Sequence, residues 1–503
     1  WFFSSVAHLV YTSRMSLRND AEYEHEKTTT LYPLLEGERL ISIVHHPLSP
    51  AAAPPSSIEQ MMRLTHSDRS RDIGKNGPAL ASLALDPKET NEHLRLYEAV
   101  FGRDSLRVAG YLVERYPELA KQTVLRLAEL QGVTYSTERE EEPGRIVHEA
   151  RTDSDPQAKR LTQERGWQWP YYGAVDTNAE FIRTLYSYTI KTEDSSFLSH
   201  TYTDRRGETH SISHALRSAL DWIARKRLSN PEGLIEFKSV LPMGIENQVW
   251  KDSWDAYHHA DGTLANHAQG IASLEVQVAS YDALLDAASL YESYLDDPVY
   301  SAALHSQAEE LRQSIVHHFW TEDKGGYFVL GTDRDNAGNL RQLKIRTSNM
   351  GHALNSRLLE GQDPESVRMR TATIAHITSP ELRCASGIRT LASDEIRFRP
   401  GAYHNGSVWL WDTHYIAKGL RRHGKATVAD SIDQALITVS NKTGMFPEYV
   451  RGEQERIALN EDSVRIWDEA AQRENLIEQP PQEVQAWTVA AILESKTLRT
   501  QRS

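Results

Sequence analysis

The chain has 503 residues, of which 39% are hydrophobic and 25% charged, a balance typical of a globular protein with an extensive core. Its net charge of −14 repels phosphate backbones and anionic lipid surfaces, so we expect neither a nucleic-acid nor a membrane partner. The single cysteine, Cys384, excludes a disulfide within the chain and a cysteine-based metal cluster, and it favours a reducing, cytoplasmic location.

The first 85 residues predict an N-terminal extension that packs against a main domain over 86–503. Residues 1–15 are apolar but have no basic segment before the apolar part, so they do not resemble a signal peptide. They are interpreted either as sequence upstream of a true start at Met15 or as a fragment edge. A Pro- and Ala-rich run at 47–57 indicates a linker or loop. No stretch approaches the ~18 consecutive apolar residues of a membrane-spanning helix.

From Leu85 onward the apolar pattern is helical. Apolar side chains recur at spacings of three and four residues, as expected for amphipathic helices, over 120–128, 181–188, 216–223 and 281–288. The best strand candidate is 326–330, which reads as a short hairpin arm. About twelve helices joined by long loops would account for the remaining length, and long loops at one end of a helical scaffold commonly carry the site.

Two early segments carry polar and aromatic groups at the start of a predicted helix. In one, Arg103 and Asp104 could grip vicinal sugar hydroxyls, although Asp104 could also be a plain helix cap. In the other, Trp169 and Tyr171 precede Asp176, and aromatic faces stack on pyranose rings. Core packing of these aromatic rings around a helix capped by Asp176 is the alternative interpretation.

The segment 246–255 is the richest in chemistry. A carboxyl beside Trp250 in a low-water pocket would stay protonated near neutral pH, as a general acid requires, and Asp252 fits that place. Lys251 and Asp255 flank it, and Asp255 is its rival as the acid. A surface loop with satisfied charges is the alternative.

Two later segments complete the candidate set. Asn405 and Gly406 indicate a turn next to His404, and the following helix begins near Trp409. Pro447 stiffens the backbone before Glu448, which suits a base that positions one water molecule, whereas an exposed turn is the alternative. The histidines at 258, 259 and 267 lack metal-ligand spacing, and no dinucleotide or phosphate-loop motif is present, so we expect no metal and no cofactor.

Eight short motifs occur in the order found in one known family. The chain resembles the amylo-α-1,6-glucosidase domain of glycogen debranching enzymes and, more distantly, the neutral invertases and glucoamylases. The matching pieces are FGRDSL (101–106), YYGAVDTNAEFI (171–182), ENQVWKDSWD (246–255), EVQ (275–277), SGIRTLAS (386–393), YHNGSVW (403–409), FPEY (446–449) and QAW (485–487). The resemblance implies an all-α protein, an (α/α)6 toroid barrel with a short irregular N-terminal extension.

The resemblance also implies roles for individual residues. Asp252 corresponds to the proton donor and Glu448 to the base of an inverting hydrolase of an α-glucoside. The remaining candidates are expected to line the sugar subsite; they are Arg103, Asp104, Trp169, Tyr171, Asp176, Trp250, Lys251, Asp255, Gln277, His404, Asn405, Trp409 and Trp487.

The main functional prediction is debranching of glycogen or an oligosaccharide. The run Trp409-Leu410-Trp411-Asp412 departs from the relatives' usual sequence and could reshape the pocket mouth. Alternatives are the same barrel acting on a small glycoside (glucosylglycerate, mannosylglycerate, sucrose or trehalose) or a carbohydrate-binding relative without catalysis. A narrow pocket would favour the small glycosides.

Overall fold

The computed structural model of the protein describes residues 34–46, 56–66, 78–86, 88, 95–152, 154–469 and 472–500. The segment 1–15 and most of the expected linker at 47–57 lie outside these residues. No helix in the described ranges is both long and apolar enough to cross a membrane.

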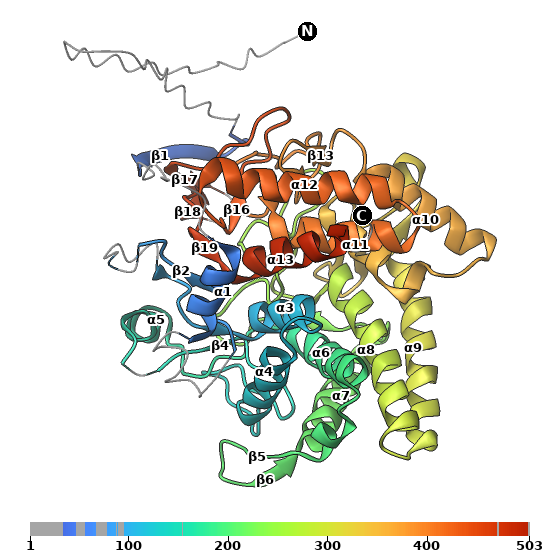
Figure 1. Ribbon diagram of the computed structural model, residues 1–503. Coiled ribbons are helices and arrows are strands. Elements are labelled where there is room, and N and C mark those ends of the chain that lie inside the picture. Colours follow the sequence, from blue (N-terminus) through green and yellow to red (C-terminus); the bar gives the residue numbers. More distant parts are fainter. Residues whose placement is uncertain are drawn as a thin grey trace, which may run out of the picture.

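In the described part of the chain, six helical elements form the inner wall of a barrel, where each contacts the next and the last returns to the first (Figure 1). In ring order they are α3 (Gly102–Leu112), α6 (Thr177–Thr192), α8 (Leu274–Ser293), the 3-10 helix η4 (Ser348–Asn355), α11 (Leu410–Arg422) and α13 (Ala486–Thr500).

A second layer of helices covers this wall. In the same ring order the outer partners are α4 (Pro117–Glu129), α7 (Ile212–Leu228), α9 (Pro298–Phe319), α10 (Pro364–Ile377), α12 (Ala426–Thr443) and α1 (Ser57–His66). Helix α5 (Pro156–Arg165) lies in a loop before α6. Further 3-10 turns are η2 (Ser195–Ser199), η3 (Asp323–Gly325) and η5 (Arg357–Leu359).

The burial of the helices follows from the two layers. Helix α8 is buried on nearly all sides because it faces both the barrel interior and the outer helix α9. Helix α9 buries only one stripe, in which Leu304, Ala308, Leu311 and Ile315 recur at helical spacing. At its start Asp297 accepts a hydrogen bond from the N–H of the third helical residue, which caps the helix.

The strands are short and lie mostly in the loops. Strand β1 (Glu38–His45) pairs antiparallel with β17 (Asp462–Asp468), which pairs with β18 (Arg473–Glu478). A four-stranded sheet has the order β12 (Leu340–Leu343), β11 (Gly331–Arg334), β8 (Ile271–Ser273) and β7 (Glu236–Phe237).

Two-stranded pairs complete the set. They are β2 (Ser82–Leu83) with β19 (Val484–Gln485), β3 (Val100–Phe101) with β4 (Glu149–Ala150), β5 (Thr201–Thr203) with β6 (Thr209–Ser211), β9 (Trp320–Thr321) with β10 (Tyr327–Phe328), β13 (Arg383–Cys384) with β14 (Gly387–Ile388), and β15 (Val408–Trp409) with β16 (Tyr449–Val450).

The four predicted helical stripes are confirmed as α4, α6, α7 and α8, and the predicted hairpin arm is β10. The expectation of a helical barrel holds, but "all-α" describes the barrel alone because the loops form short sheets. Within the first 85 residues, β1 pairs with β17 and α1 packs on α13, so this segment contributes to a loop sheet and to the outer helix layer. The boundary at residue 85 remains a prediction.

The two ends of the barrel differ. Long loops lead from each outer helix to the N-terminus of the next inner element, as in 130–176 between α4 and α6 and 444–485 between α12 and α13. At the opposite end the connections from inner to outer helices are mostly short, as in 423–425 between α11 and α12. The long loops therefore gather at the end where the inner helices begin, which is where a site is expected.

Candidate active site

A narrow cavity of about 50 Å³ lies at the long-loop end of the barrel and contains both predicted catalytic acids. Such a volume holds a few water molecules. It is lined by Ala81, Tyr97, Phe101, Arg103, Asp104, His148, Trp250, Asp252, Tyr403, Trp409, Glu448, Gln485 and Trp487. The lining draws on segments far apart in the sequence, which the closed ring of inner helices brings together.

Asp252 is held by anchors on both neighbouring residues. The Lys251 ammonium donates to the Thr390 carbonyl at 2.6 Å, and the Ser253 N–H donates to His404 Nδ1 at 3.2 Å. The Asp252 side chain itself is about one-third exposed, and it faces the cavity. These anchors fix the backbone while leaving the carboxyl free to meet a substrate.

Glu448 reaches the cavity from the loop between α12 and β16. Its N–H donates to the Gln482 carbonyl at 2.9 Å, and its carboxylate accepts from the Gln482 N–H at 3.2 Å and from the Tyr403 hydroxyl. The Pro447 carbonyl accepts from Thr488 at 2.9 Å, which ties the loop to α13. Two donors on one carboxylate stabilise its ionised form.

Burial is the largest influence on the acids in the cavity. It raises the pKa of Asp252 to about 7, against the opposing effect of the Arg103 charge. Burial also raises the pKa of Glu448 to about 8, although the hydrogen bonds from Tyr403 and Gln482 lower it. The Asp252 charge also raises the pKa of Glu448, so the titrations of the two carboxyls are linked, and between the two pKa values the pair holds one proton.

Arg103 and Asp104 line the cavity as predicted, from the first turn of α3. Arg103 forms a two-point ion pair with Asp176, with Nε to Oδ2 at 2.5 Å and Nη2 to Oδ1 at 3.3 Å. Asp176 therefore sits behind Arg103 and lines a separate space of about 10 Å³. Burial raises the pKa of Asp104 to about 7, and Gln485 donates to its Oδ1 at 3.3 Å.

Three tryptophans line the cavity and contact one another. The Trp250 and Trp409 ring centroids are 5.9 Å apart, and those of Trp409 and Trp487 are 5.7 Å apart, both edge to face. The indole N–H groups of Trp250 and Trp487 are buried without a hydrogen-bond partner among the described residues. Such donors beside a cavity suit sugar hydroxyls, while the ring faces suit the apolar faces of a pyranose.

Besides Asp176, seven predicted site residues are absent from the cavity lining, and several of them hold the structure around it. Tyr171 is buried, and its ring centroid lies 4.0 Å from that of Trp167 in a stacked arrangement. Its hydroxyl donates a hydrogen bond to the Glu140 carboxylate, so its role is core packing. Trp169 does not line the cavity, and its ring centroid lies 6.0 Å from the Arg151 guanidinium carbon. The Gln277 side-chain amide accepts a hydrogen bond from the Ile235 N–H at 2.9 Å and donates one to the Ile235 carbonyl at 2.8 Å.

The other four lie behind or beside Asp252. Asn405 donates to the Asp255 carbonyl at 2.8 Å, and the Asp255 carboxylate accepts from Ser253 at 3.2 Å. Lys251 is fully buried, and burial lowers its pKa to about 7. His404 lies 4.0 Å from Asp252, and burial holds its pKa well below 6.5, so the ring is neutral.

The backbone of the turn after His404 requires a glycine at position 406. Gly406 has a φ of +145°, and a Cβ there would meet the Arg399 carbonyl oxygen at 2.2 Å. Only glycine allows that approach, so the predicted Asn-Gly turn is confirmed as a close backbone contact.

Sequence reasoning missed five polar or aromatic groups of the cavity: Tyr97, Phe101, His148, Tyr403 and Gln485. Phe101, Tyr403 and Gln485 lie inside the recognised motifs, so the signal was present. Tyr97 and His148 lie in segments without a distinctive pattern. The two tyrosine hydroxyls of Tyr97 and Tyr403 are 3.5 Å apart, which places them side by side next to Glu448.

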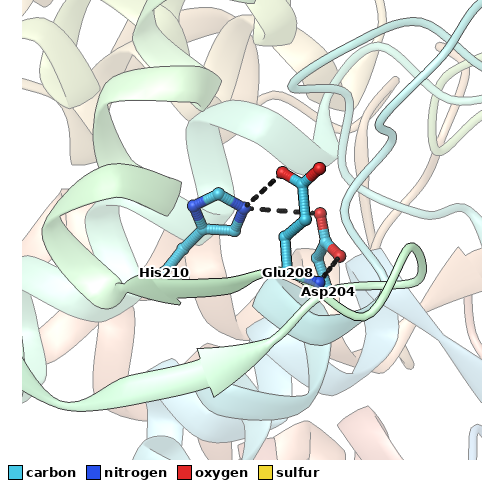
Figure 2. A group of neighbouring side chains, drawn as sticks. All are labelled: Asp204, Glu208 and His210. Atoms are coloured by element: carbon cyan, nitrogen blue, oxygen red, sulfur yellow. Dashed lines mark hydrogen bonds and ion pairs between the residues drawn. The ribbon is translucent and has the colours of Figure 1, made fainter.

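Three side chains with metal-ligand chemistry lie close together elsewhere, on the β5–β6 hairpin. Figure 2 shows Asp204, Glu208 and His210 pointing toward one another, with His210 Nε2 at 3.4 and 3.6 Å from the two carboxylates. Asp204 accepts hydrogen bonds from the N–H groups of Arg206 and Glu208, so it closes the hairpin turn. None of the three residues lines the cavity.

Two sequence comparisons both match this chain to mannosylglycerate hydrolases. The profile of the mannosylglycerate hydrolase MGH1-like glycoside hydrolase domain matches residues 169–470. A mannosylglycerate hydrolase from Rubrobacter radiotolerans is 26% identical over 165 residues, which are 32% of this chain and 34% of the relative. The match thus spans about a third of the length of that curated relative.

Solved structures agree at the level of fold. A GH63 mannosylglycerate hydrolase from Thermus thermophilus in complex with Tris and D-glycerate has a TM-score of 0.58 at 14% identity, covering 88% of this chain and 99% of that one. Its complex with glucose has a TM-score of 0.54 at 15% identity, covering 88% and 98%. The similarity supports the helical barrel.

Proposed function

Because this chain belongs to the mannosylglycerate hydrolase MGH1-like glycoside hydrolase family, we propose that it hydrolyses a small α-glycoside of mannosylglycerate or glucosylglycerate type. The family match supports glycoside hydrolysis in general and gives no support to debranching of glycogen. The small-glycoside alternative from the sequence is therefore favoured over the main prediction.

One observation carries the assignment of the site: Asp252 and Glu448, 196 positions apart, line the same narrow aromatic cavity. The cavity is narrow, whereas the branch point of a polymer would need a broad groove, so the site favours a small glycoside. The closed inner ring supports the expected (α/α)6 toroid as its scaffold.

In the proposed reaction Asp252 donates its proton to the glycosidic oxygen as the bond to the anomeric carbon breaks. Glu448 removes a proton from a water molecule, whose oxygen bonds to the anomeric carbon from the opposite face. The configuration inverts through an oxocarbenium-like state, a geometry in which the carboxyls are ~6.5–9.5 Å apart, against ~5–5.5 Å in a retaining enzyme. The released alcohol and the free sugar account for all atoms.

A substrate panel tests the proposal. We expect release of a monosaccharide from mannosylglycerate or glucosylglycerate and little from isomaltose, panose, limit dextrin, sucrose or trehalose. Efficient release from limit dextrin or panose would restore the debranching function. Binding of these sugars with no turnover of any of them would indicate a carbohydrate-binding relative without catalysis.

A further inference from the structure

A second and larger cavity, of about 390 Å³, lies on the other side of the barrel interior. Its walls come from four inner helices, with Gly110 on α3, Ser187 on α6, Asp286 on α8 and Lys418 on α11. It shares no lining residue with the catalytic cavity. Its volume lies within the range of small-molecule sites, roughly 300–1,000 Å³.

The two cavities are separated by ion pairs. The small space of about 10 Å³ between them is lined by Arg103 and Trp250, which also face the catalytic cavity, and by Arg107 and Glu180, which also face the large one. Arg107 and Glu180 pair at 2.7 Å, and both side chains are nine-tenths buried. The large cavity is therefore a separate compartment.

The charges around the large cavity are balanced. Each of its five cationic side chains has an acidic partner within 3.5 Å; the pairs are Arg107–Glu180, Arg183–Asp282, Arg357–Asp286, Lys418–Glu494 and Arg422–Glu360. The lining itself holds five cationic and three acidic side chains, and Glu494 and Glu360 beside it supply the other two carboxylates. With every cation paired in this way, the cavity favours a neutral ligand over an anion or a cation. Guanidinium donors alternate there with carboxylate acceptors, and this mixture suits hydroxyl groups, which both donate and accept.

We propose that this cavity is a second binding site for a neutral polyhydroxy compound of monosaccharide to disaccharide size. Its hydroxyls would accept from the guanidinium groups and donate to the carboxylates that pair across this cavity on α3, α6 and α8. The site is independent of the catalytic cavity, and its occupancy does not depend on the proposed hydrolysis.

Gly110 offers a way to fill this cavity with little disturbance. A Cβ at this helical position would meet no atom within 4 Å, so a side chain can extend into open space. Replacing glycine by another residue inside a helix also favours the helix, by about 0.5–1 kcal/mol for alanine. Gly110→Trp would occupy the cavity, while Gly110→Ala adds one methyl group and leaves most of it open.

Isothermal titration calorimetry with glucose and with trehalose tests the proposal, using the Glu448→Gln background to prevent turnover. We expect a binding event that persists in Gly110→Ala and weakens at least about tenfold in Gly110→Trp, equivalent to about 1.4 kcal/mol. Gly110→Leu repeats the test with a smaller side chain should the tryptophan variant not fold. Binding at the catalytic cavity would give a separate event that the Gly110 variants do not change.

Three outcomes would overturn the second site. The first is sugar binding that Gly110→Trp and Gly110→Leu leave unchanged, and the second is no sugar binding beyond a single event at the catalytic cavity. The third is that inorganic phosphate, titrated in parallel, binds in a Gly110-sensitive way while neither sugar does. Failure of the hydrolase proposal alone would look different, because the Gly110-sensitive event would remain while no glycoside is turned over.

Discussion

Tyr403 donates its phenolic hydroxyl to the carboxylate of Glu448, and this contact joins the His404 loop to the loop that follows α12. The donor stabilises the ionised carboxyl in a site where burial favours the neutral one. A base needs its ionised form, so this contact supports the role of Glu448 more directly than its position in the cavity does.

Tyr403→Phe removes that donor and should raise the pKa of Glu448 above about 8. Fewer enzyme molecules would then combine an ionised Glu448 with a protonated Asp252, so maximal kcat/KM should fall about tenfold or more. The alkaline limb of the pH profile, set by the higher pKa of the pair, should move to higher pH. An unchanged profile would contradict the contact's role, and Tyr449→Phe serves as a control because its hydroxyl donates to the Gln479 carbonyl instead.

The wild-type pH profile follows from the paired carboxyls. With pKa values of about 7 for Asp252 and about 8 for Glu448, the singly protonated pair is most populated between these values, so kcat/KM should be bell-shaped with its maximum there. The same bell results whichever carboxyl holds the shared proton in the free enzyme. A maximum near pH 5, measured with a small glycoside, would contradict the raised pKa values of the pair.

Glu448→Gln should stabilise the fold at alkaline pH. The folded pKa of Glu448, about 8, lies above its ordinary value of 4.5, so its contribution to stability is present below 4.5 and is lost as pH rises through 8. Glutamine has no charge to bury. The melting temperature of the variant should therefore exceed that of the wild type above pH 8 and approach it below pH 4.5, and a constant offset at all pH values would contradict this reasoning.

Asp176→Asn should destabilise the protein because it leaves Arg103 as a buried, unpaired charge. Breaking such a pair costs about 3–5 kcal/mol. The two side chains are only 5% and 8% exposed. Lys191→Gln is the matched control, since its pair with Glu114 is about half exposed and should contribute only about 0–1 kcal/mol. Denaturant unfolding measures the free energy of unfolding of both variants. Equal losses of that free energy would contradict the difference expected between the buried and the exposed ion pair.

Asp252→Asn and Asp255→Asn distinguish the two rivals for the general acid. Asp252 faces the cavity, whereas Asp255 is absent from its lining and accepts from Ser253. We expect a loss of at least about 10³-fold in kcat for Asp252→Asn and a loss of less than about tenfold for Asp255→Asn. Circular dichroism of both variants should show the wild-type helical content. The opposite order of activities would make Asp255 the acid.

Helices with one apolar stripe were predictable from the sequence because a half-buried helix shows its period, as in α4 and α7. The 3-10 helix η4 was not, since Ser348–Asn355 is short and buried along most of its length. Nor did the sequence reveal that α1, which precedes a segment outside the described residues, packs on the C-terminal helix α13.

The site was predictable only in part, for a related reason. Asp252 and Glu448 stood out through their neighbours, but their meeting in one cavity depends on closure of the inner ring, which no local pattern encodes. Residues beside the acids were harder to assign: His404 and Asn405 are polar and next to the site, yet their side chains anchor backbone at Ser253 and Asp255. A sequence motif identifies the residues of a loop but does not show where their side chains point.

The stereochemistry of the first-formed product tests the central claim most directly. Proton NMR during hydrolysis of α-mannosylglycerate or α-glucosylglycerate should show the β-anomer of the free sugar first, followed by mutarotation, and no product with Asp252→Asn or Glu448→Gln. Initial appearance of the α-anomer, or turnover by either variant at the wild-type rate, would contradict inversion by these two carboxyls.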